Sequence, residues 1–564
     1  MKKLLLLLLI SGVLVTSSCK KYLDEKPQGL LTQNQLLSKD GVDGLVTMAY
    51  HSLHTYFPST GSTFLHPPTN WSFGDARSDD AYKGGGGTGD ITDYTLLELC
   101  NISTDNGAVF AKWQANYVAI ANVNNAIVAL NKIDASVYPE KKNRLAEMKV
   151  LRGHFYFDLL KHYYQVPWID ETNNDLVSAS AVKNDLTNAQ LWAKVEADFK
   201  EGFALPAIQA DKNRVTSGAA HAYMAKAYMY DHSNNWAGVR TETDFVINSG
   251  NYKLVDNLEY IYSLPEHNWD GENVFAIACS VKDGTTNGIL NWGDLLCAPA
   301  GPGAGYTNGD GFHRPSQDLV NNFQVDGNGL PLGFTQSTLP KLDSNSKTTP
   351  VDPRLDHAIG RPGIPWKDNL TAIEDLSYCR ALDVYGPYVR KKNIISPNSP
   401  YRSNSGFPWA LGALNVPMIK YSDVLLWRAE AEINLGNIPA AIGYINQIRT
   451  RAANPVNIVK TAAGVPAATY KIGNYPLTLN AADAMKALKL ERRLELCLEG
   501  QRFYDLVRWG DAASVINNYY KTEGQLRPWL LAGNFIANKH EYLPVPQVEL
   551  DKSQGLYIQN QFYK

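Results

Sequence analysis

A helical hairpin pattern in residues 422–452 is the feature that most constrains the fold of this chain. In this segment, SDVLLWRAEAEINLGNIPAAIGYINQIRTRA, apolar residues recur at steps of three and four on both sides of a Leu-Gly break. Ala429 and Ala431 before the break, and Ala440 and Ala441 after it, allow two helices to pack closely. Because such a hairpin buries its apolar face only against its neighbours, the pattern predicts stacked helix pairs of the tetratricopeptide type.

Helical periodicity also occurs in other parts of the chain. Residues 217–248 show a second hairpin pattern of the same kind. No strict period of about 34 residues runs through the sequence, so we expect irregular hairpins rather than a regular solenoid. The first helix carries apolar residues from Val42 to Tyr50, and Thr32 or Ser38 could cap it. Further predicted helices span 106–133, 139–164, 187–204, 217–231 and 236–249.

Residues 251–415 differ from the helical regions in composition. Gly, Pro, Asn and Asp become frequent there, and segments such as 298–311 and 397–409 combine them as turns do. Long loops on a compact protein usually carry function. We therefore expect a mainly α protein built from irregular tetratricopeptide-type hairpins. A single domain at 32–564 would consist of a helical scaffold, at about 32–250 and 416–520, and a loop-rich subdomain with little β structure, at about 251–415.

The N-terminus has the organisation of a lipoprotein signal peptide. Two lysines precede the apolar run 4–15, which is too short to span a bilayer and too close to the start to belong to the fold. Small residues then lead to Cys19, although Thr16 stands where an aliphatic residue is usual. We predict a signal peptide over 1–18, lipidation of Cys19 and a tether over 19–31. The alternative is a plain secretory signal with an accidental cysteine.

Charge and aromatic content restrict the kind of ligand. The net charge of −3 does not indicate that the protein binds nucleic acid or another acidic polymer. The chain contains 31 Tyr and 12 Trp, residues that suit sugar rings and protein interfaces, although an aromatic core is the alternative. The cysteines after Cys19 are odd in number and form no CxxC motif, so neither a zinc knuckle nor a dense disulfide framework is indicated. One or two disulfide bonds remain possible.

The stretch 491–510, ERRLELCLEGQRFYDLVRWG, concentrates charge and could be either an acid/base site or a helix tied to its neighbours. On one continuous helix, Glu499, Arg502, Asp505 and Arg508 recur at three-residue steps and would form a ladder of opposite charges. Carboxylates beside arginines have lowered pKa values and make poor general acids. A glycosidase needs the reverse, a carboxyl with a raised pKa beside a free carboxylate. We therefore interpret this stretch as structural.

Signatures of enzymes and cofactors are missing from the sequence. It contains no GxSxG, HExxH or phosphate-loop motif, and its 11 histidines include no pair with metal-binding spacing backed by a carboxylate. The run GGGGTG at 84–89 lacks the lysine of a phosphate loop, and we interpret it as a flexible rim. A structural calcium is conceivable among the Asp/Asn loops, but no DxDxDG-type loop supports one. We expect a protein that is not an enzyme and carries no cofactor.

Six segments are distributed over nearly the whole mature chain: CKKYLD (19–24), 148–169, 352–366, 487–500, EGQRFYDLVRWGDA (499–512) and 543–563. Together, and in the family's order, they resemble the SusD/RagB family of outer-membrane nutrient-binding lipoproteins. The resemblance implies an α-rich fold of about four tetratricopeptide-type helix pairs with a variable loop face. It also implies a SusC-type TonB-dependent transporter as partner and a glycan, less often a peptide, as cargo.

The resemblance also places ligand binding just after FGDARSDDAYKGGGG, residues 73–87. Asp79 and Asp80 match the family's acidic pair, and Tyr82 stands where an aromatic platform is expected. A sugar offers an apolar C–H face to an aromatic ring, while its hydroxyls need carboxylates, amides or arginine. Glycines at 84–87 depart from the pattern, so the platform would be smaller or assembled from other loops. Further candidates, each of which could instead anchor a loop, are Trp71, Trp292, Tyr306 and His313.

These observations lead to one expected function and two alternatives. We expect a lipid-anchored protein at the outer membrane, facing the cell surface, that captures a glycan and delivers it to a SusC-like transporter. The first alternative is a surface glycoside hydrolase, which would need a carboxylate pair in the loop-rich region. The second is a helical-repeat scaffold for protein interactions without a small ligand. The sequence does not name the glycan.

Overall fold

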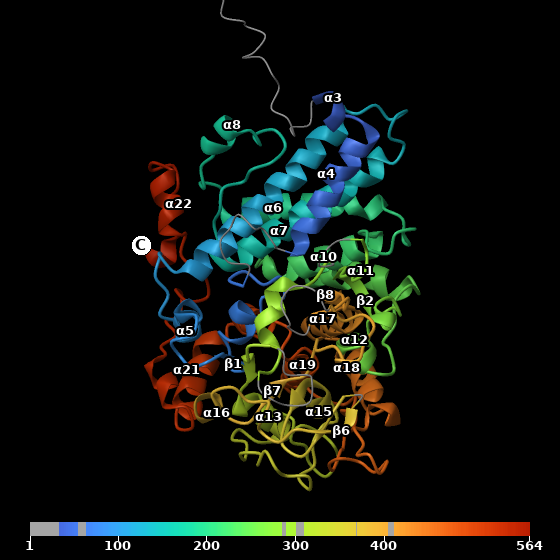
Figure 1. Ribbon diagram of the computed structural model, residues 1–564, viewed down its shortest axis with the longest axis vertical. Helices are drawn as coiled ribbons and strands as arrows, with labels where there is room; N and C mark the ends of the chain where they lie inside the picture. The colour runs from blue at the N-terminus through green and yellow to red at the C-terminus, as the bar shows by residue number, and fades with distance from the viewer. Residues whose placement is uncertain (1–32, 55–63, 285–288, 301–308, 368, 404–410) are drawn as a thin grey trace, which may run out of the picture.

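The computed structural model describes residues 33–54, 64–284, 289–300, 309–367, 369–403 and 411–564. The predicted signal peptide, Cys19 and Tyr306 lie outside these residues. In Figure 1 long helices fill the upper half of the molecule, and short strands and helices joined by loops fill the lower half. Within the described ranges, no helix is long and apolar enough to cross a membrane.

The long helices form where apolar periodicity predicts them, and polar caps fix their starts. Ser38 accepts a hydrogen bond from the Gly41 N–H at 3.1 Å, and Asn106 caps the next long helix in the same way. Thr187 and Gln190 form a reciprocal capping box. The helices of the scaffold are α3 (Gln33–Leu36), α4 (Lys39–His51), α5 (Thr92–Glu98), α6 (Gly107–Lys132), α7 (Lys141–Tyr163), α8 (Leu176–Ser180), α9 (Asn188–Glu201), α10 (Ser217–Tyr230), α11 (Trp236–Asn248), α17 (Tyr421–Asn434) and α18 (Ile438–Ala452).

Successive helices pack as pairs and the pairs pack on each other. Helix α6 contacts α7, α10 contacts α11 and α17 contacts α18, while contacts of α7 with α9 and of α11 with α17 join neighbouring pairs. Ala429, Ala431 and Ala441 are fully buried, so their small side chains let α17 and α18 approach closely. Gly436 ends the first helix of this pair with φ +81°. The predicted fold class, mainly α with irregular hairpins and little β structure, is confirmed.

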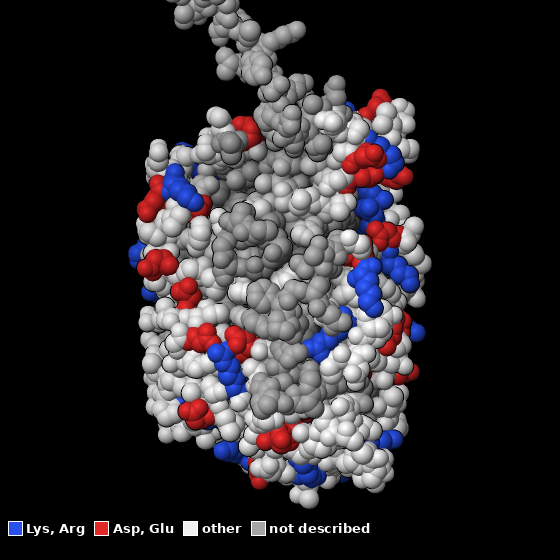
Figure 2. All heavy atoms as spheres, viewed as in Figure 1, with Lys and Arg blue, Asp and Glu red and all other residues white. Residues whose placement is uncertain are grey.

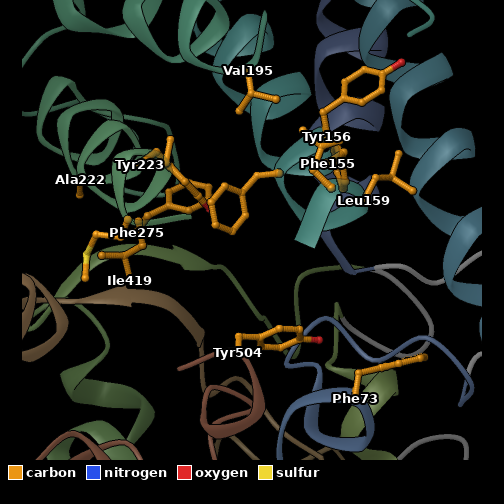
Figure 3. Packing of buried hydrophobic residues seen from close by; sticks show 14 of the residues in the cluster. Phe73, Phe155, Tyr156, Leu159, Val195, Ala222, Tyr223, Phe275, Ile419 and Tyr504 are labelled. Carbon is orange, nitrogen blue, oxygen red and sulfur yellow. The ribbon is translucent and has the colours of Figure 1, made fainter. Parts of the chain in front are cut away.

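An aromatic core lies between the helix pairs and the first strands below them. In Figure 3 Phe155 of α7 and Tyr223 of α10 point toward one another from neighbouring helices. The Tyr223 ring stacks on Phe199 at 5.0 Å and meets Phe275 edge-on at 5.7 Å. Ile419 lies beside Phe275 in the same view. Because these residues come from scaffold helices and from strands, the two halves of the molecule share one core.

The strands form four separate two-stranded antiparallel sheets in the described part of the chain. The pair β2–β8 closes the segment between residues 273 and 420 back onto the scaffold, because β8 runs directly into α17. The pair β1–β3 joins the N-terminal region to this segment. The pairs are β1 (Ala81–Gly84) with β3 (Phe312–Pro315), β2 (Asn273–Ile277) with β8 (Val416–Lys420), β4 (Ile359–Gly360) with β7 (Val389–Arg390), and β5 (Pro365–Trp366) with β6 (Asn369–Ile373).

Short helices lie among these strands, and three C-terminal helices pack against them. Helix α19 contacts α14, α17 and α18, and α21 contacts α13, so the C-terminal region connects the scaffold with the lower half. The elements are α12 (Glu259–Tyr262), α13 (Gln317–Asn322), α14 (Leu332–Thr335), α15 (Arg354–Ala358), α16 (Leu382–Tyr385), α19 (Ala481–Glu495), α20 (Arg502–Arg508), α21 (Ala512–Glu523) and α22 (Gln547–Lys552). The shorter helical turns are η1 (Ser52–His54), η3 (Trp71–Asp75), η4 (Gly202–Ala204), η5 (Pro265–His267), η6 (Trp292–Cys297), η7 (Pro455–Asn457), η8 (Pro528–Ala532) and η9 (Gln561–Tyr563).

The charged stretch 491–510 is two helices rather than one, which corrects the predicted continuous ladder. Helix α19 ends at Glu495, and Leu498 and Gly500 then take positive φ values of +61° and +72°. A Cβ on Gly500 would lie 1.9 Å from the Thr69 carbonyl oxygen, so only glycine fits this contact. After this break the chain forms a second helix, α20, whose side chains do not continue the faces of α19.

The charges after this break are neutralised by distant partners. Glu499 accepts from Lys392 at 2.7 Å and from Lys420 at 2.8 Å, although the helical ladder paired it with Arg502. The predicted pair Asp505–Arg508 does form, at 2.9 Å. Asp505 also binds Arg492 of α19, and Arg508 binds Glu430 of α17. The interpretation of the stretch as structural agrees with these contacts between elements.

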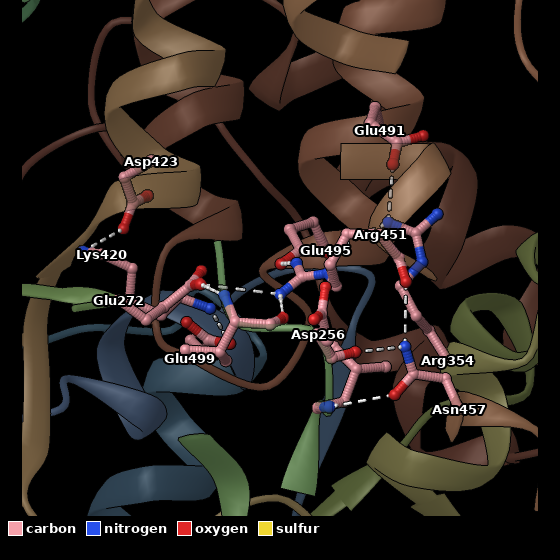
Figure 4. Close-up of polar contacts among 12 residues, drawn as sticks. Asp256, Glu272, Arg354, Lys420, Asp423, Arg451, Asn457, Glu491, Glu495 and Glu499 are labelled. Carbon is pink, nitrogen blue, oxygen red and sulfur yellow. Dashed lines mark hydrogen bonds and ion pairs between the residues drawn. The ribbon is translucent and has the colours of Figure 1, made fainter. Parts of the chain in front are cut away.

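A second buried network connects α19 to the lower half. Arg354 lies 2.6 Å from Glu491 and 3.1 Å from Glu495, and Arg449 lies 2.8 Å from Glu491. Arg451 also pairs with Glu495, and Figure 4 shows these side chains converging between the helices.

All five described cysteines are free, so none of them forms the disulfides that the sequence left open.

Candidate functional site

Strands β1 and β3 bring the predicted site residues to one place in the fold. They pair antiparallel with Tyr82 opposite Arg314, so the segment after residue 73 runs beside the segment before residue 316. The turn η3 begins at Trp71 and precedes β1, and η6 begins at Trp292 and packs against β3. The predicted residues that the structure describes therefore surround one small sheet.

Trp71 and His313 form a buried pair of stacked rings. Their centroids are 5.3 Å apart, and Trp71 Nε1 donates to the Gly293 carbonyl oxygen at 3.3 Å. Both side chains are 0% exposed. The prediction that these two residues contact a ligand is therefore wrong for this structure, because the folded chain encloses both rings.

A buried carboxyl group lies next to these rings. Asp75 Oδ2 accepts from the Gly500 N–H at 2.7 Å and lies 2.9 Å from His313 Nε2. Burial raises the pKa of Asp75 to about 7, and burial also holds the pKa of His313 well below its usual value. This residue was missed because the motif FGDARSDD drew attention to its later acidic pair. Its contacts join η3 to the break before α20.

The acidic pair that the resemblance marked is held by two arginines. Arg502 binds Asp79 through two hydrogen bonds of 2.8 and 3.0 Å, and Arg493 lies 3.1 Å from Asp79 and 2.8 Å from Asp80. Burial acts to raise the pKa of Asp79, but the two guanidinium groups hold it below its usual value. The pair is buried, so its carboxylates join β1 to α19 and α20 instead of facing a sugar. The prediction that they bind ligand directly is wrong here.

Tyr82 is also part of the core. Its ring is 1% exposed and lies against Tyr385 and Trp529, at centroid distances of 6.1 and 6.2 Å. Its hydroxyl donates to Glu523 and accepts from the Gln317 N–H at 3.3 Å. A sugar cannot stack on a ring that its neighbours cover, so the predicted platform at Tyr82 is wrong. Of the predicted aromatic residues that the structure describes, only Trp292 is half-buried rather than enclosed.

The glycine run after β1 forms a close-packed turn. A Cβ on Gly85 would lie 2.6 Å from the Phe312 ring, and one on Gly86 would lie 2.7 Å from a guanidinium nitrogen of Arg380. Gly84 and Gly85 have φ values near +80°. The glycines are therefore needed because β3 and Arg380 lie against the backbone, and the interpretation of a flexible rim misses these contacts.

Three partly exposed charged side chains lie beside this turn and form what we call the sheet-end patch: Asp90, Asp310 and Arg380. Their side chains are 30%, 31% and 37% exposed. Arg380 pairs with Asp310 and lies 3.5 Å from Asp90, whose Oδ2 also accepts from the Gly86 N–H at 2.7 Å. No motif marks these residues, because three separate segments supply them.

The sheet-end patch has the chemistry that sugar hydroxyls require. A guanidinium group offers several donors in a plane, and two carboxylates offer acceptors beside it. Burial acts to raise the pKa of Asp310, and Arg380 opposes that rise. On the face seen in Figure 2, acidic and basic side chains are interspersed in the coloured area without a field of one sign. Among the described residues no cluster of three or more His, Cys, Asp or Glu could hold a metal ion.

Comparison with known families identifies the class of protein that this fold and sequence define. Residues 271–563 match the model of the SusD family, and residues 21–229 match a related family described as starch-binding and associating with the outer membrane. The first match covers more than half of the chain. The chain therefore belongs to the SusD family, as its motifs predicted.

Relatives and solved structures agree over almost the whole length. SusD-like protein P25 of Formosa agariphila is 22% identical over 562 residues, which cover 94% of each chain. A SusD superfamily protein from Bacteroides vulgatus superposes with a TM-score of 0.69 at 21% identity, covering 93% of this chain and 98% of the other. Surface glycan-binding protein A from Bacteroides thetaiotaomicron, solved with laminarihexaose, has a TM-score of 0.69 at 20% identity, covering 93% and 99%. These similarities confirm the fold.

Proposed function

We propose that this protein binds a glycan at the cell surface and delivers it to a SusC-like TonB-dependent transporter. Membership in the SusD family is the observation that carries this proposal. Structural neighbours that share the fold are named for binding laminarin and laminarihexaose. The related family model is described as starch-binding and associated with the outer membrane. The signal-peptide pattern before Cys19 supports a lipid anchor in that membrane.

The sheet-end patch is the surface that we assign to the ligand. It lies at the end of β1, directly after the motif where the family resemblance placed binding. Arg380 would donate to neighbouring hydroxyls of one sugar, while Asp90 and Asp310 would accept from others. Half-buried Trp292 belongs to η6, which packs against the same sheet, and is the aromatic residue best placed to add an apolar contact.

Binding without hydrolysis fits the carboxylates of this patch. A glycosidase uses two carboxyl groups that flank the scissile bond, one of them a proton donor. Asp90 and Asp310 share a single guanidinium group instead. The pKa of Asp310 is raised above its usual value by burial, and Arg380 opposes that rise.

A panel of neutral and acidic polysaccharides tests the proposal. Electrophoresis of the purified protein through gels that contain each polysaccharide should show retardation by at least one of them. Incubation with the same polymer should release no reducing ends. Retardation by none of the polymers would contradict glycan binding, and release of reducing ends would favour the hydrolase. Co-purification of the barrel from the native membrane tests the transporter separately.

A further inference from the structure

A broad groove lies on the other side of β1 from the sheet-end patch. It has a volume of about 860 Å³ and is bounded by α13, α19, α20, α21 and the loop after α14. Asp79 lines it at the start of β1, whereas the patch begins after Gly84 at the other end. At about 3.3 Å per residue, strand β1 itself spans about 10 Å from Ala81 to Gly84. The volume is at the upper end of the range typical of ligand sites, about 300–1,000 Å³.

Most of the charges that line the groove are engaged in ion pairs, whereas the exposed Lys341 and Lys486 have no ion-pair partner among the described residues. Five basic and four acidic side chains line it. Arg493 donates to Asp80 and Asp318 at 2.8 and 2.7 Å, and Arg502 binds Asp79 with two hydrogen bonds. An anionic ligand would have to displace these carboxylates from their guanidinium partners, at the cost of leaving them unpaired. The part of the groove where these ion pairs lie therefore favours an uncharged ligand.

Uncommitted polar groups occur on two opposite walls. Gln336, Ser337 and Thr338 form one rim, and Asn518 of α21 lies on the other. Their side chains are exposed, and no hydrogen bond joins them to another side chain or backbone group in the described ranges. Amides and hydroxyls both donate and accept, as vicinal sugar hydroxyls require.

The interior of the groove adds an apolar surface and one unpaired hydroxyl. Leucine, valine and methionine side chains from α19, α20 and α21 line it, and half-buried Trp509 stands at its edge. Tyr519 is only 2% exposed, and its hydroxyl has no hydrogen-bond partner among the described residues. A buried hydroxyl without a partner is costly, and a ligand or water in the groove would satisfy it.

These features favour a sugar chain over a peptide. An extended peptide binds by adding a strand to an open sheet edge, and the residues lining this groove come from helices and a loop. A helical peptide needs a continuous apolar trough, but here amides, hydroxyls and ion pairs interrupt the apolar residues. A sugar chain alternates C–H faces with hydroxyls, which matches this mixture.

We propose that the groove is a second glycan site, which holds an uncharged stretch of polysaccharide while the sheet-end patch holds another. This inference rests on the proposed function, because it assumes that the protein binds glycans. Two weak sites on one chain raise the affinity for long polymers far more than for short ones. Long neutral polysaccharides should therefore bind through both sites.

The test compares a groove variant with a matched control on the full-length mature chain. The groove variant combines Gln336→Ala with Asn518→Ala. The control combines Asn251→Ala with Gln561→Ala, two exposed amides outside the groove. Gel retardation by laminarin and starch, which are neutral, and by alginate, which is acidic, gives the apparent affinities, and thermal melts check folding.

The groove variant should bind the neutral polysaccharide that retards the wild type at least about tenfold more weakly than the wild type does. The control should bind it as the wild type does. Unchanged binding by a folded groove variant would overturn the second site and leave the proposed function standing. Groove-dependent binding of alginate would also overturn it, because the inference requires an uncharged ligand. If the wild type bound no polysaccharide, the proposed function would fail, and this inference with it.

Discussion

Asp75 shows how one buried group can report on the centre of this fold. It accepts from the Gly500 N–H and lies beside His313, with no exposure to solvent. Its pKa of about 7 lies above the usual value of 3.8 because burial penalises the charged form. The folded state therefore favours the protonated carboxyl. The contribution of Asp75 to stability is fully present below about pH 4 and is lost as the pH rises toward 7.

Asp75→Asn should make the free energy of unfolding less dependent on pH between 5 and 7.5. Asparagine keeps an oxygen that can accept from Gly500 but has no charge to bury. Relative to the variant, the wild type should lose about 1–3 kcal/mol over this range. Urea denaturation at several pH values measures the difference. Parallel stability curves for the two proteins would show that Asp75 is not protonated in the fold.

At the scale of elements, α19 is tied to the lower half by buried ion pairs. Glu495 lies between Arg451 and Arg354, and all three side chains are almost fully buried. Their charges are compensated only while all partners are present. The partly exposed pair of Lys489, on the same helix, with Asp511, just before α21, offers a contrast, since the two side chains are 30% and 35% exposed.

Glu495→Ala should lower the free energy of unfolding by about 3–5 kcal/mol, because it removes a buried carboxylate that two buried guanidinium groups share. Asp511→Ala, the matched control, removes an exposed ion pair and should cost about 0–1 kcal/mol. Thermal and chemical denaturation of both variants checks this. Equal effects of the two substitutions would contradict a structural role for the buried network.

The elements also show which parts of the fold were readable from the sequence. Helices such as α6 and α7 were predictable to within a few residues, because apolar spacing and cap residues are local properties. The break at Leu498 and Gly500 was missed because the charged residues keep a helical spacing across it. A contact with Thr69, far away in the sequence, requires that break.

The candidate site was less predictable for a related reason. The motif located the correct strand, but enclosure of Tyr82 by Tyr385 and Trp529 depends on segments hundreds of residues away. Arg380 and Asp310 come from loops without any recognisable motif. Exposure is a tertiary property, so the sequence indicated the neighbourhood of the site and not the side chains that reach the surface.

On the scale of the whole molecule, we expect the protein to be attached to a membrane through Cys19. Cys19→Ala should abolish the incorporation of radiolabelled palmitate and shift the protein out of the detergent phase in phase partition. The wild type should be labelled and stay in that phase. Equal labelling of both proteins would contradict the assigned lipidation site.

Calorimetric titration can show directly whether this protein binds a glycan. The ligand is a short oligosaccharide of the polymer that retards the wild type in the gel. The measurement compares the wild type, Arg380→Ala in the sheet-end patch and Lys552→Ala, which alters an exposed ion pair on α22. We expect binding by the wild type and by Lys552→Ala, and at least about tenfold weaker binding by a folded Arg380→Ala. No heat of binding with the wild type would contradict glycan binding, and full affinity of Arg380→Ala would contradict the assigned surface.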